Sequence, residues 1–217
     1  MSKRGVLTVI SGFSGAGKGT LMKKIVEKYQ YGLSVSATTR TPREGEVHGR
    51  EYFFLSREEF EQMIDRKELI EWAEYVGNYY GTPKTYVEEQ LAQGKDVILE
   101  IEIQGALQVR DIFPEASLVF VTPPTAKELR ERLVSRGTED IATVDKRMNR
   151  AIEESKFMPQ YDYIVINDKL EDCVEELHQL IEKEGQRQNS TNAPRETKDY
   201  KEFILKIQKE LKELVTI

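Results

Sequence analysis

The chain has 217 residues, which is enough for one large domain or two small ones. Its 32 Lys and Arg residues are outnumbered by 38 Asp and Glu residues, and the net charge of −6 argues against a protein that binds DNA or RNA through many phosphate contacts. A single cysteine excludes an internal disulfide, and together with only two histidines it cannot build a tetrahedral zinc site.

The first apolar run, Val6–Ile10, is too short for the apolar region of a secretory signal. No other stretch approaches the ~20 apolar residues of a membrane span. We therefore expect a cytoplasmic protein that does not bind membranes.

Short β-branched runs alternate with longer amphipathic segments along the chain. Continuous apolar runs of this kind predict strands that are buried on both faces of a parallel sheet. Their alternation with helices predicts an α/β fold with right-handed crossovers. The predicted strands are Val6–Ile10, Val97–Ile101, Leu118–Val121 and Tyr163–Ile166.

A glycine-rich loop follows the first strand and opens a helix that we expect to run to about Gln30. It reads Gly12-Phe-Ser-Gly-Ala-Gly-Lys18-Gly19-Thr20, which has the spacing of a P-loop. Glycines let backbone N–H groups curl around an anion, and Lys18 can reach the outer phosphates. Gly19 stands where this motif usually has a hydroxyl that binds Mg²⁺, so we expect phosphates and water to hold the metal and Thr20 to contact a phosphate.

The segment from Ser34 to about Thr82 is rich in β-formers, turns and aromatics, and it predicts a small inserted β-rich unit. Arg40 and Arg43 lie three residues apart beside a proline, and Tyr52 follows. Guanidinium groups and a phenol are suited to binding a second phosphate, although two arginines could also simply solvate a surface loop.

Helix boundary signals recur in the middle of the chain. Ser56 and Glu59 form a capping-box pattern for a helix to about Arg66. Thr82 followed by Pro83 predicts a helix start, and Gly94 predicts the end of that helix near Gln93. We expect Trp72, beside Glu71, to lie in the core rather than to serve as a stacking platform.

The strand Val97–Glu100 ends in a carboxylate, as does the strand that orients Mg²⁺ in many P-loop proteins. Glu100 is therefore a candidate metal residue, acting directly or through water, although many ordinary strands also end in an acid. Residues 126–157 are helical and basic, and Thr125 with Glu128 predicts their first cap and Gly137 the helix end.

The C-terminal region combines a polar stretch and an apolar stripe. Gln186–Thr197 is polar enough to predict a linker, and Tyr200–Leu214 has apolar residues at helical spacing. A single helix of this length is marginal in water, so the stripe should pack against something. Docking on the same chain and pairing with a second subunit are equally compatible with the pattern, so both a monomer and a homo-oligomer remain open.

Several segments, in this order, strongly resemble the guanylate kinase family between about Val6 and Glu184. Besides the P-loop they are Thr38-Thr-Arg40-Thr-Pro-Arg43-Glu-Gly-Glu46, Glu71-Trp-Ala, Gly77-Asn-Tyr-Tyr80-Gly-Thr82, Ile103-Gln-Gly105, Arg136-Gly-Thr-Glu and Tyr161-Asp-Tyr. The resemblance implies a P-loop three-layer α/β fold with a mostly parallel sheet, an inserted β-rich GMP-binding unit and a helical lid. In these terms the chain divides into core (1–33, 83–125 and 158–185), GMP-binding insertion (34–82), lid (126–157), polar linker (186–199) and C-terminal amphipathic helix (200–217).

The resemblance also implies transfer of the γ-phosphoryl group of ATP to GMP with Mg²⁺, and it assigns roles to matching residues. For the catalytic charges it implies Lys18, Arg40, Arg43, Arg136 and Arg147. For ATP it implies Gly12, Ser14, Gly15, Ala16, Gly17, Lys18, Gly19 and Thr20, with Asn167 and Asp168 near the adenine. For GMP it implies Ser36, Arg40, Arg43, Tyr52, Glu71, Tyr80, Thr82 and Glu102. Position 102 is commonly Asp in the family, and Glu is one methylene longer.

The chemistry is consistent with this reading, because a phosphate monoester with a second pKa of about 6 is already nucleophilic at neutral pH and needs no general base. Three other readings compete with it. A non-catalytic guanylate-kinase-like interaction module usually loses the P-loop or the arginines that this sequence keeps. A kinase for another nucleotide is disfavoured by the paired carboxylates Glu71 and Glu102, and a GTPase by the lack of an Asn-Lys-x-Asp motif.

Overall fold

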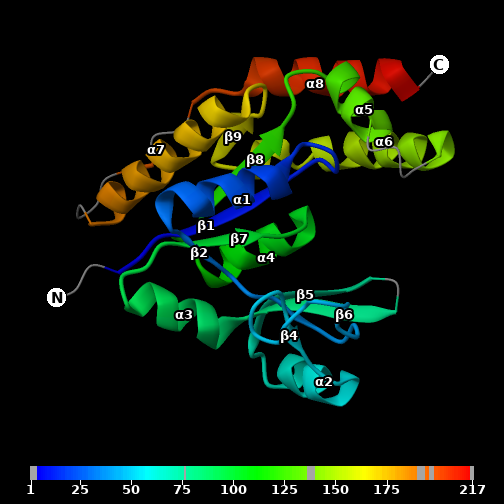
Figure 1. Ribbon diagram of the computed structural model, residues 1–217. Helices are drawn as coiled ribbons and strands as arrows, with labels where there is room; N and C mark the ends of the chain where they lie inside the picture. The colour runs from blue at the N-terminus through cyan, green and yellow to red at the C-terminus, as the bar shows by residue number, and fades with distance from the viewer. Residues whose placement is uncertain (1–3, 76, 136–139, 190–193, 196–197, 216–217) are drawn as a thin grey trace.

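The protein is described here by a computed structural model, which covers residues 4–75, 77–135, 140–189, 194–195 and 198–215. Two sheets organise these residues, one of five strands and one of four (Figure 1). The larger sheet lies in the middle of the molecule, the smaller one forms a lower lobe, and a group of helices caps the upper end. Arg136 and the expected helix end at Gly137 lie outside the described residues.

The five-stranded sheet is parallel throughout and has the order β2-β7-β1-β8-β9. The four strands predicted from apolar runs are confirmed, and the short edge strand β2 adds to them. The carboxyl ends of parallel strands share one edge of a sheet, where ligands commonly bind. The strands are β1 (Leu7–Gly12), β2 (Gly32–Leu33), β7 (Val97–Glu100), β8 (Ser117–Thr122) and β9 (Tyr163–Ile166).

Helices pack around this sheet and enclose the main core. Helix α1 (Lys18–Tyr29) packs on α7 (Leu170–Asn189), α4 (Ile103–Ile112) packs on β1, and α3 (Lys84–Ala92) packs on β7. Phe120 is fully buried, with its ring edge-on to those of Phe13 and Tyr161 at centroid distances of 5.0 and 5.2 Å. Within the described part of the chain, no helix is both long enough and apolar enough to cross a membrane.

The lower lobe has its own small core. Its sheet has the order β4-β3-β6-β5 and is covered by α2 (Arg57–Asp65), whose Phe60 is fully buried against Ala37 and Leu69. The capping box predicted at the start of α2 is confirmed, because Ser56 accepts from the Glu59 amide and Glu59 accepts from the Ser56 amide. The strands are β3 (Ala37–Thr38), β4 (Phe53–Phe54), β5 (Leu69–Tyr75) and β6 (Asn78–Pro83).

The start of α3 differs from the prediction. Pro83 is the N-cap residue rather than the first helical residue, and the Thr82 hydroxyl does not cap the helix. That hydroxyl instead donates to the Glu71 carboxylate at 2.6 Å. The sequence pattern therefore located the boundary correctly but missed the tertiary partner that takes the hydroxyl. The end of the helix near Gln93 is confirmed.

Helices α5 (Ala126–Ser135) and α6 (Ile141–Ser155) lie at the upper end of the molecule, beside α8 (Lys201–Val215) (Figure 1). The predicted apolar stripe is the face by which α8 packs against α5, α6 and the short 3₁₀ turn Met158–Gln160. Ile204, Ile207 and Leu211 are buried there. In this structure the C-terminal helix therefore docks on its own chain.

The predicted linker begins later than expected. Helix α7 continues to Asn189, so the expected start at Gln186 is wrong. The helix continues because residues beyond Gln186 still have partners. Arg187 donates to the buried Glu184 at 2.9 Å, and Gln188 donates to the Glu115 carbonyl oxygen at 3.0 Å. Beyond it, Arg195 returns to the core and forms ion pairs with Asp162 at 2.7 Å and Glu184 at 3.2 Å.

The docking of α8 on its own chain is testable by urea denaturation. Replacing Ile207, which is 1% exposed, with Ala should lower the free energy of unfolding by about 2–5 kcal/mol, because it leaves a cavity in a packed interface. Leu205→Ala on the exposed face of the same helix should change it by less than about 0.5 kcal/mol. Both values should be the same at every protein concentration, and a loss that appears only at low concentration would indicate pairing with a second subunit.

Candidate functional site

The loop between β1 and α1 has the backbone of an anion-binding site. Gly15 and Gly17 adopt φ values of +92° and +88°, which favour glycine. A Cβ atom on Gly12 would lie 2.0 Å from the Val121 carbonyl oxygen, so the loop also needs glycine for its close approach to β8. The first turn of α1 contains no acidic residue, and its amides are directed toward the end of the loop.

Lys18 is the first residue of α1 and folds back over the loop. Its Nζ donates to the carbonyl oxygens of Gly12 at 2.7 Å and Phe13 at 3.1 Å. The ammonium group is therefore held at the carboxyl edge of the sheet before any ligand binds. Gly19 and Thr20 follow in the same turn and are exposed, and a Cβ at Gly19 would meet nothing within 4 Å.

A second set of contacts fixes the other side of the loop. The buried Asn167, directly after β9, donates from Nδ2 to the Ala16 carbonyl oxygen at 2.8 Å. Arg132 of α5 donates to the Asn167 carbonyl oxygen at 2.6 Å and to that of Ala16 at 3.4 Å. The sequence did not predict a role for Arg132 at the site, because it is one of several basic residues in this region and nothing in the local pattern distinguishes it. Asp168, the neighbouring expected residue, is exposed.

Helix α6 also reaches the loop. Arg147 donates from its guanidinium group to the Ser14 hydroxyl, so the structure brings together these two residues of the predicted donor site. Its expected companion Arg136 cannot be placed in this way, because it lies outside the described residues. The P-loop is thus contacted from three directions, by β9, α5 and α6.

Glu100 occupies the position expected of a metal residue. It ends β7, in register with Ile10 of β1, and the surrounding protein raises the pKa of its carboxyl by desolvation while Lys18 opposes that shift. Among the described residues, no group of three or more His, Cys, Asp or Glu side chains is arranged to hold a metal ion. A metal at Glu100 would therefore need oxygen atoms from phosphate and water, which suits Mg²⁺.

The predicted acceptor residues gather in the lower lobe. Arg40 pairs with Glu46 at 2.9 Å, and its guanidinium carbon lies 5.4 Å from the ring centre of Tyr52. Glu46 also accepts from the Arg43 backbone amide, and this hydrogen bond lowers the pKa of the Glu46 carboxyl. Tyr52 and Tyr80 meet edge to face at 6.1 Å. These contacts confirm neither the role of the arginines nor that of the tyrosines, but they place one guanidinium and two phenols in a single cluster.

Glu71 of β5 lies at the inner end of this lobe, facing α4. Its carboxylate accepts from the Thr82 hydroxyl at 2.6 Å, and its Oε2 would be 2.9 Å from a Cβ atom on Gly105. Gly105 is therefore small because the carboxylate fills the space beside it. Desolvation raises the pKa of Glu71 and the hydrogen bond from Thr82 opposes that shift. Ser36, the remaining expected residue of this region, precedes β3 and accepts from the Phe53 amide through its carbonyl oxygen.

Glu102 has a partner that the sequence did not reveal. Arg150 of α6 forms an ion pair with Glu102 at 2.5 Å and another with Glu154 at 2.7 Å. Glu154 is 9% exposed, and desolvation raises the pKa of its carboxyl. Arg150 and Arg147 lie three residues apart, on one face of α6. One helix therefore reaches both the P-loop and Glu102.

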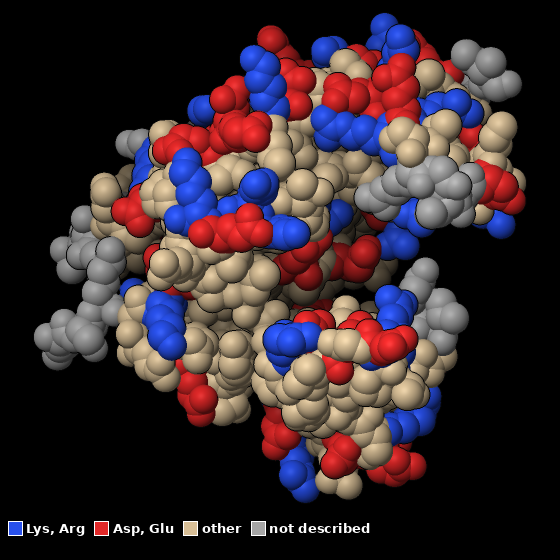
Figure 2. Space-filling model, in the orientation of Figure 1, with Lys and Arg blue, Asp and Glu red and all other residues tan. Residues whose placement is uncertain are grey.

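Figure 2 shows the molecule hollowed between the lower lobe and the body above it, with acidic side chains exposed inside the hollow. The P-loop lies at the carboxyl edge of the large sheet, and Glu71 lies on the lobe that faces it. The P-loop therefore lies on one side of this hollow. The lower lobe, with the arginine, the two tyrosines and Glu71 described above, lies on the other side.

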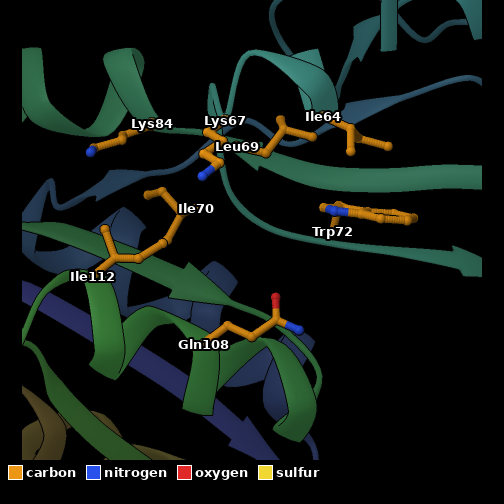
Figure 3. A pocket seen from close by; sticks show the side chains of 8 residues that line it. All are labelled: Ile64, Lys67, Leu69, Ile70, Trp72, Lys84, Gln108 and Ile112. Carbon is orange, nitrogen blue, oxygen red and sulfur yellow. The ribbon is translucent and has the colours of Figure 1, made fainter. Parts of the chain in front are cut away.

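A separate pocket of about 370 Å³ opens beside β5, between the lower lobe and α4 (Figure 3). Trp72 lines it and is 41% exposed, so the expectation that this residue belongs to the core is wrong. Side chains alternate along a strand, and Trp72 therefore points away from its neighbour Glu71. The other lining residues are Ile64, Lys67, Leu69, Ile70, Lys84, Gln108 and Ile112. None of them is a predicted nucleotide-binding residue.

Comparisons with known proteins agree on one family. The family described as guanylate kinase matches residues 4–184. A guanylate kinase of Bacillus subtilis (strain 168) is 53% identical over 183 residues, which are 83% of this chain and 90% of the relative. A guanylate kinase of Latilactobacillus sakei subsp. sakei (strain 23K) is 48% identical over 206 residues, which are 94% of this chain and 99% of the relative.

A solved structure supports the same grouping. The crystal structure of guanylate kinase from Anaplasma phagocytophilum is similar with a TM-score of 0.66 and 31% sequence identity. The similarity covers 85% of this chain and 88% of that chain. The chain thus shares its fold with a solved member of the same family.

The burial of Glu71 predicts a pH-dependent stability. Because desolvation raises its pKa above the ordinary 4.5, ionising Glu71 costs stability as the pH rises through that raised pKa. Glu71→Gln removes this cost and leaves an oxygen to accept from Thr82. Chemical denaturation should therefore find the variant more stable than the wild type at pH 7, with the difference shrinking as the pH falls toward 4.5. A variant that is less stable at pH 7 would show that the carboxylate makes a strong stabilising contact.

Proposed function

The chain belongs to the guanylate kinase family and is an ATP:GMP phosphotransferase that produces ADP and GDP, and we propose which of its residues bind each nucleotide and which supply charge. The observation that best supports this division is the pairing of two sites across the cleft. On one side Lys18 lies over the P-loop, and on the other the lower lobe presents Arg40, two tyrosines and the half-buried Glu71. Two phosphorylated nucleotides need two anion sites, and one of them must also recognise a base. Residues 34–82 are proposed as the GMP-binding unit and 126–157 as the lid.

The donor nucleotide is proposed to bind along the P-loop. The backbone amides between Gly12 and Thr20 surround its phosphates, with Ser14 at the centre of the loop. Lys18 exchanges its two carbonyl partners for phosphate oxygens, and Arg147 moves from Ser14 to the same charges. Asn167 acts mainly by holding the loop at Ala16, with its exposed neighbour Asp168 toward the adenine.

Mg²⁺ fits the donor side. Glu100 offers an oxygen ligand or a partner for a bound water, and the phosphates and water supply the rest of the shell, because Gly19 has no hydroxyl. When bound, the ion supplies positive charge at the transferring phosphoryl group.

The acceptor phosphate is proposed to bind between Arg40, Arg43, Tyr52 and Tyr80. Arg40 is already oriented by Glu46 and stacked beside Tyr52, so its side chain loses little freedom when a phosphate binds. The guanidinium group donates through several N–H bonds, and it can keep Glu46 on one edge while it binds phosphate on another. Tyrosine hydroxyls complete the set as neutral donors.

The guanine is proposed to bind against Glu71. Guanine presents N1–H and 2-amino donors, and an ionised carboxylate accepts from both. Thr82 donates to this carboxylate, Ser36 precedes β3 of the same lobe, and Glu102 offers a second acceptor whose position depends on Arg150. A desolvated carboxylate is expected to cost stability, and such a cost is more often accepted at a binding site than in a core.

The proposed step is direct transfer in which the cleft supplies position and charge. The GMP phosphate attacks the γ-phosphorus, the bond to the ADP oxygen breaks, and the cations compensate the charge on both sides. No side chain needs to become a nucleophile. Cys173 of α7 is unsuited to that role, since it is buried and burial raises its pKa to about 12.

Replacing Lys18 with Met tests the donor site. The variant removes a charge aligned with the transferring phosphoryl group, and kcat should fall by roughly 10²–10³-fold or more. Lys23→Met, at an exposed position of the same helix, should leave kcat close to that of the wild type. A coupled assay of ADP release measures both, and near-native turnover of Lys18→Met would refute the P-loop assignment.

Base selection tests the acceptor site. AMP lacks the 2-amino group and has an acceptor at N1, so it would offer no donor to the desolvated Glu71, whose hydrogen bond from Thr82 leaves the rest of the carboxylate to be satisfied by the base. Sites of this kind reject such an analogue by roughly 10⁴-fold. The ratio of kcat/KM for GMP over AMP should therefore be large. Glu71→Gln should reduce it mainly through the KM for GMP, whereas Glu74→Gln, exposed on the same strand, should not. Equal use of GMP and AMP by the wild type would overturn the assignment.

A further inference from the structure

Helix α8 lies beyond the match to the family model, which ends at residue 184, whereas α8 begins at Lys201. It nevertheless packs on α5 and α6, the two helices that contact the P-loop. Its buried residues Ile204, Ile207 and Leu211 form one stripe, and its Gln208 donates to the Ser155 carbonyl oxygen at the end of α6. The tail is therefore attached to the proposed lid helices.

The most specific contact of α8 is made by Glu210. Its Oε2 accepts a hydrogen bond of 3.0 Å from the backbone amide of Ala126, the first residue of α5. The Thr125 hydroxyl satisfies a second free amide in the same turn, that of Glu128. A carboxylate at a helix N-terminus also interacts favourably with the helix dipole. Glu210 thus acts as a capping residue supplied by a distant part of the chain.

The opposite end of the same helix contacts the P-loop. Arg132 lies in the last turn of α5 and donates to the carbonyl oxygens of Ala16 and Asn167. Arg132 is also held by Glu128, one turn earlier, through an ion pair. A chain of contacts therefore runs from Glu210 to Ala126, along α5, and through Arg132 to the loop that receives the ATP phosphates.

We propose that Glu210 is a positioning residue for the phosphoryl donor, which fixes the start of α5 so that Arg132 holds the P-loop in its binding conformation. This inference rests on the assignment of the P-loop to ATP. Glu210 touches neither nucleotide in this account. Its effect should reach ATP and not GMP, because α5 contacts the P-loop while the proposed GMP residues lie mainly on the lower lobe.

The approach of the chain to α8 favours this contact within one molecule. Arg195 is anchored by Asp162 and Glu184, and it also donates to the carbonyl oxygens of Glu115 and Ala116. Asp162 and Glu184 are 8% and 1% exposed, so the guanidinium is tied to the core rather than to the surface. The segment leading to α8 therefore starts close to its docking site.

The experiment compares Glu210→Ala, Glu210→Gln and Glu213→Ala in the full chain, with KM for each nucleotide, kcat and the thermal midpoint measured for all. Glu213 is a matched control because it is exposed on the same helix and pairs only loosely with Lys209, at 3.8 Å. Glu210→Ala should raise the KM for ATP by about fivefold, the factor that corresponds to a lost cap of ordinary strength, with the KM for GMP unchanged. Glu210→Gln keeps an acceptor oxygen and should recover part of the loss, and Glu213→Ala should match the wild type.

Two results would overturn the proposal. A lower thermal midpoint of Glu210→Ala with both KM values unchanged would make Glu210 a purely structural residue, and an equal rise in both KM values would indicate general disorder of the cleft. Both differ from failure of the proposed function, which would appear as normal turnover by Lys18→Met.

Discussion

Two nucleotides that both carry phosphate groups must meet in a protein whose own net charge is −6. In the proposed site the cations already have acceptors within the protein. Lys18 rests on backbone carbonyls, Arg147 on a hydroxyl and Arg40 on one carboxylate. Phosphate binding can then exchange partners instead of ordering free side chains, which lowers the entropic cost of assembling the site. The arrangement is a form of electrostatic preorganisation.

The fold brings residues that are far apart in the sequence together around the P-loop. The parallel sheet brings the P-loop and Glu100 to one edge, and the residue after β9 supplies Asn167 to the back of the loop. Helices α5 and α6 contribute Arg132 and Arg147, and α8 covers both helices. The loop is thus fixed by segments far apart in sequence, so substitutions distant from the nucleotides can change how well they bind.

The features predicted correctly from the sequence are those with local causes. The glycines of the P-loop and the Ser56 capping box act within a few residues, and the buried parallel strands have an apolar pattern of their own. The features that were missed depend on tertiary partners. The Thr82 hydroxyl binds Glu71 instead of capping the helix, and Arg150 pairs with Glu102, 48 positions away. Helix α7 continues past Gln186, where Arg187 and Gln188 donate to Glu184 and to the Glu115 carbonyl oxygen. The spacing of residues along the sequence cannot predict these contacts, because the partners are brought together only by the fold.

In the proposed reaction the cleft positions ATP and GMP and supplies charge, so that the γ-phosphoryl group passes directly to GMP with no covalent intermediate on the protein. The stereochemical course at phosphorus tests it most directly, using ATP made chiral at the γ-phosphorus with oxygen isotopes and GMP as acceptor. A single in-line displacement predicts inversion of configuration in the β-phosphoryl group of GDP. Retention would require two successive displacements through a phosphorylated side chain and would contradict the account.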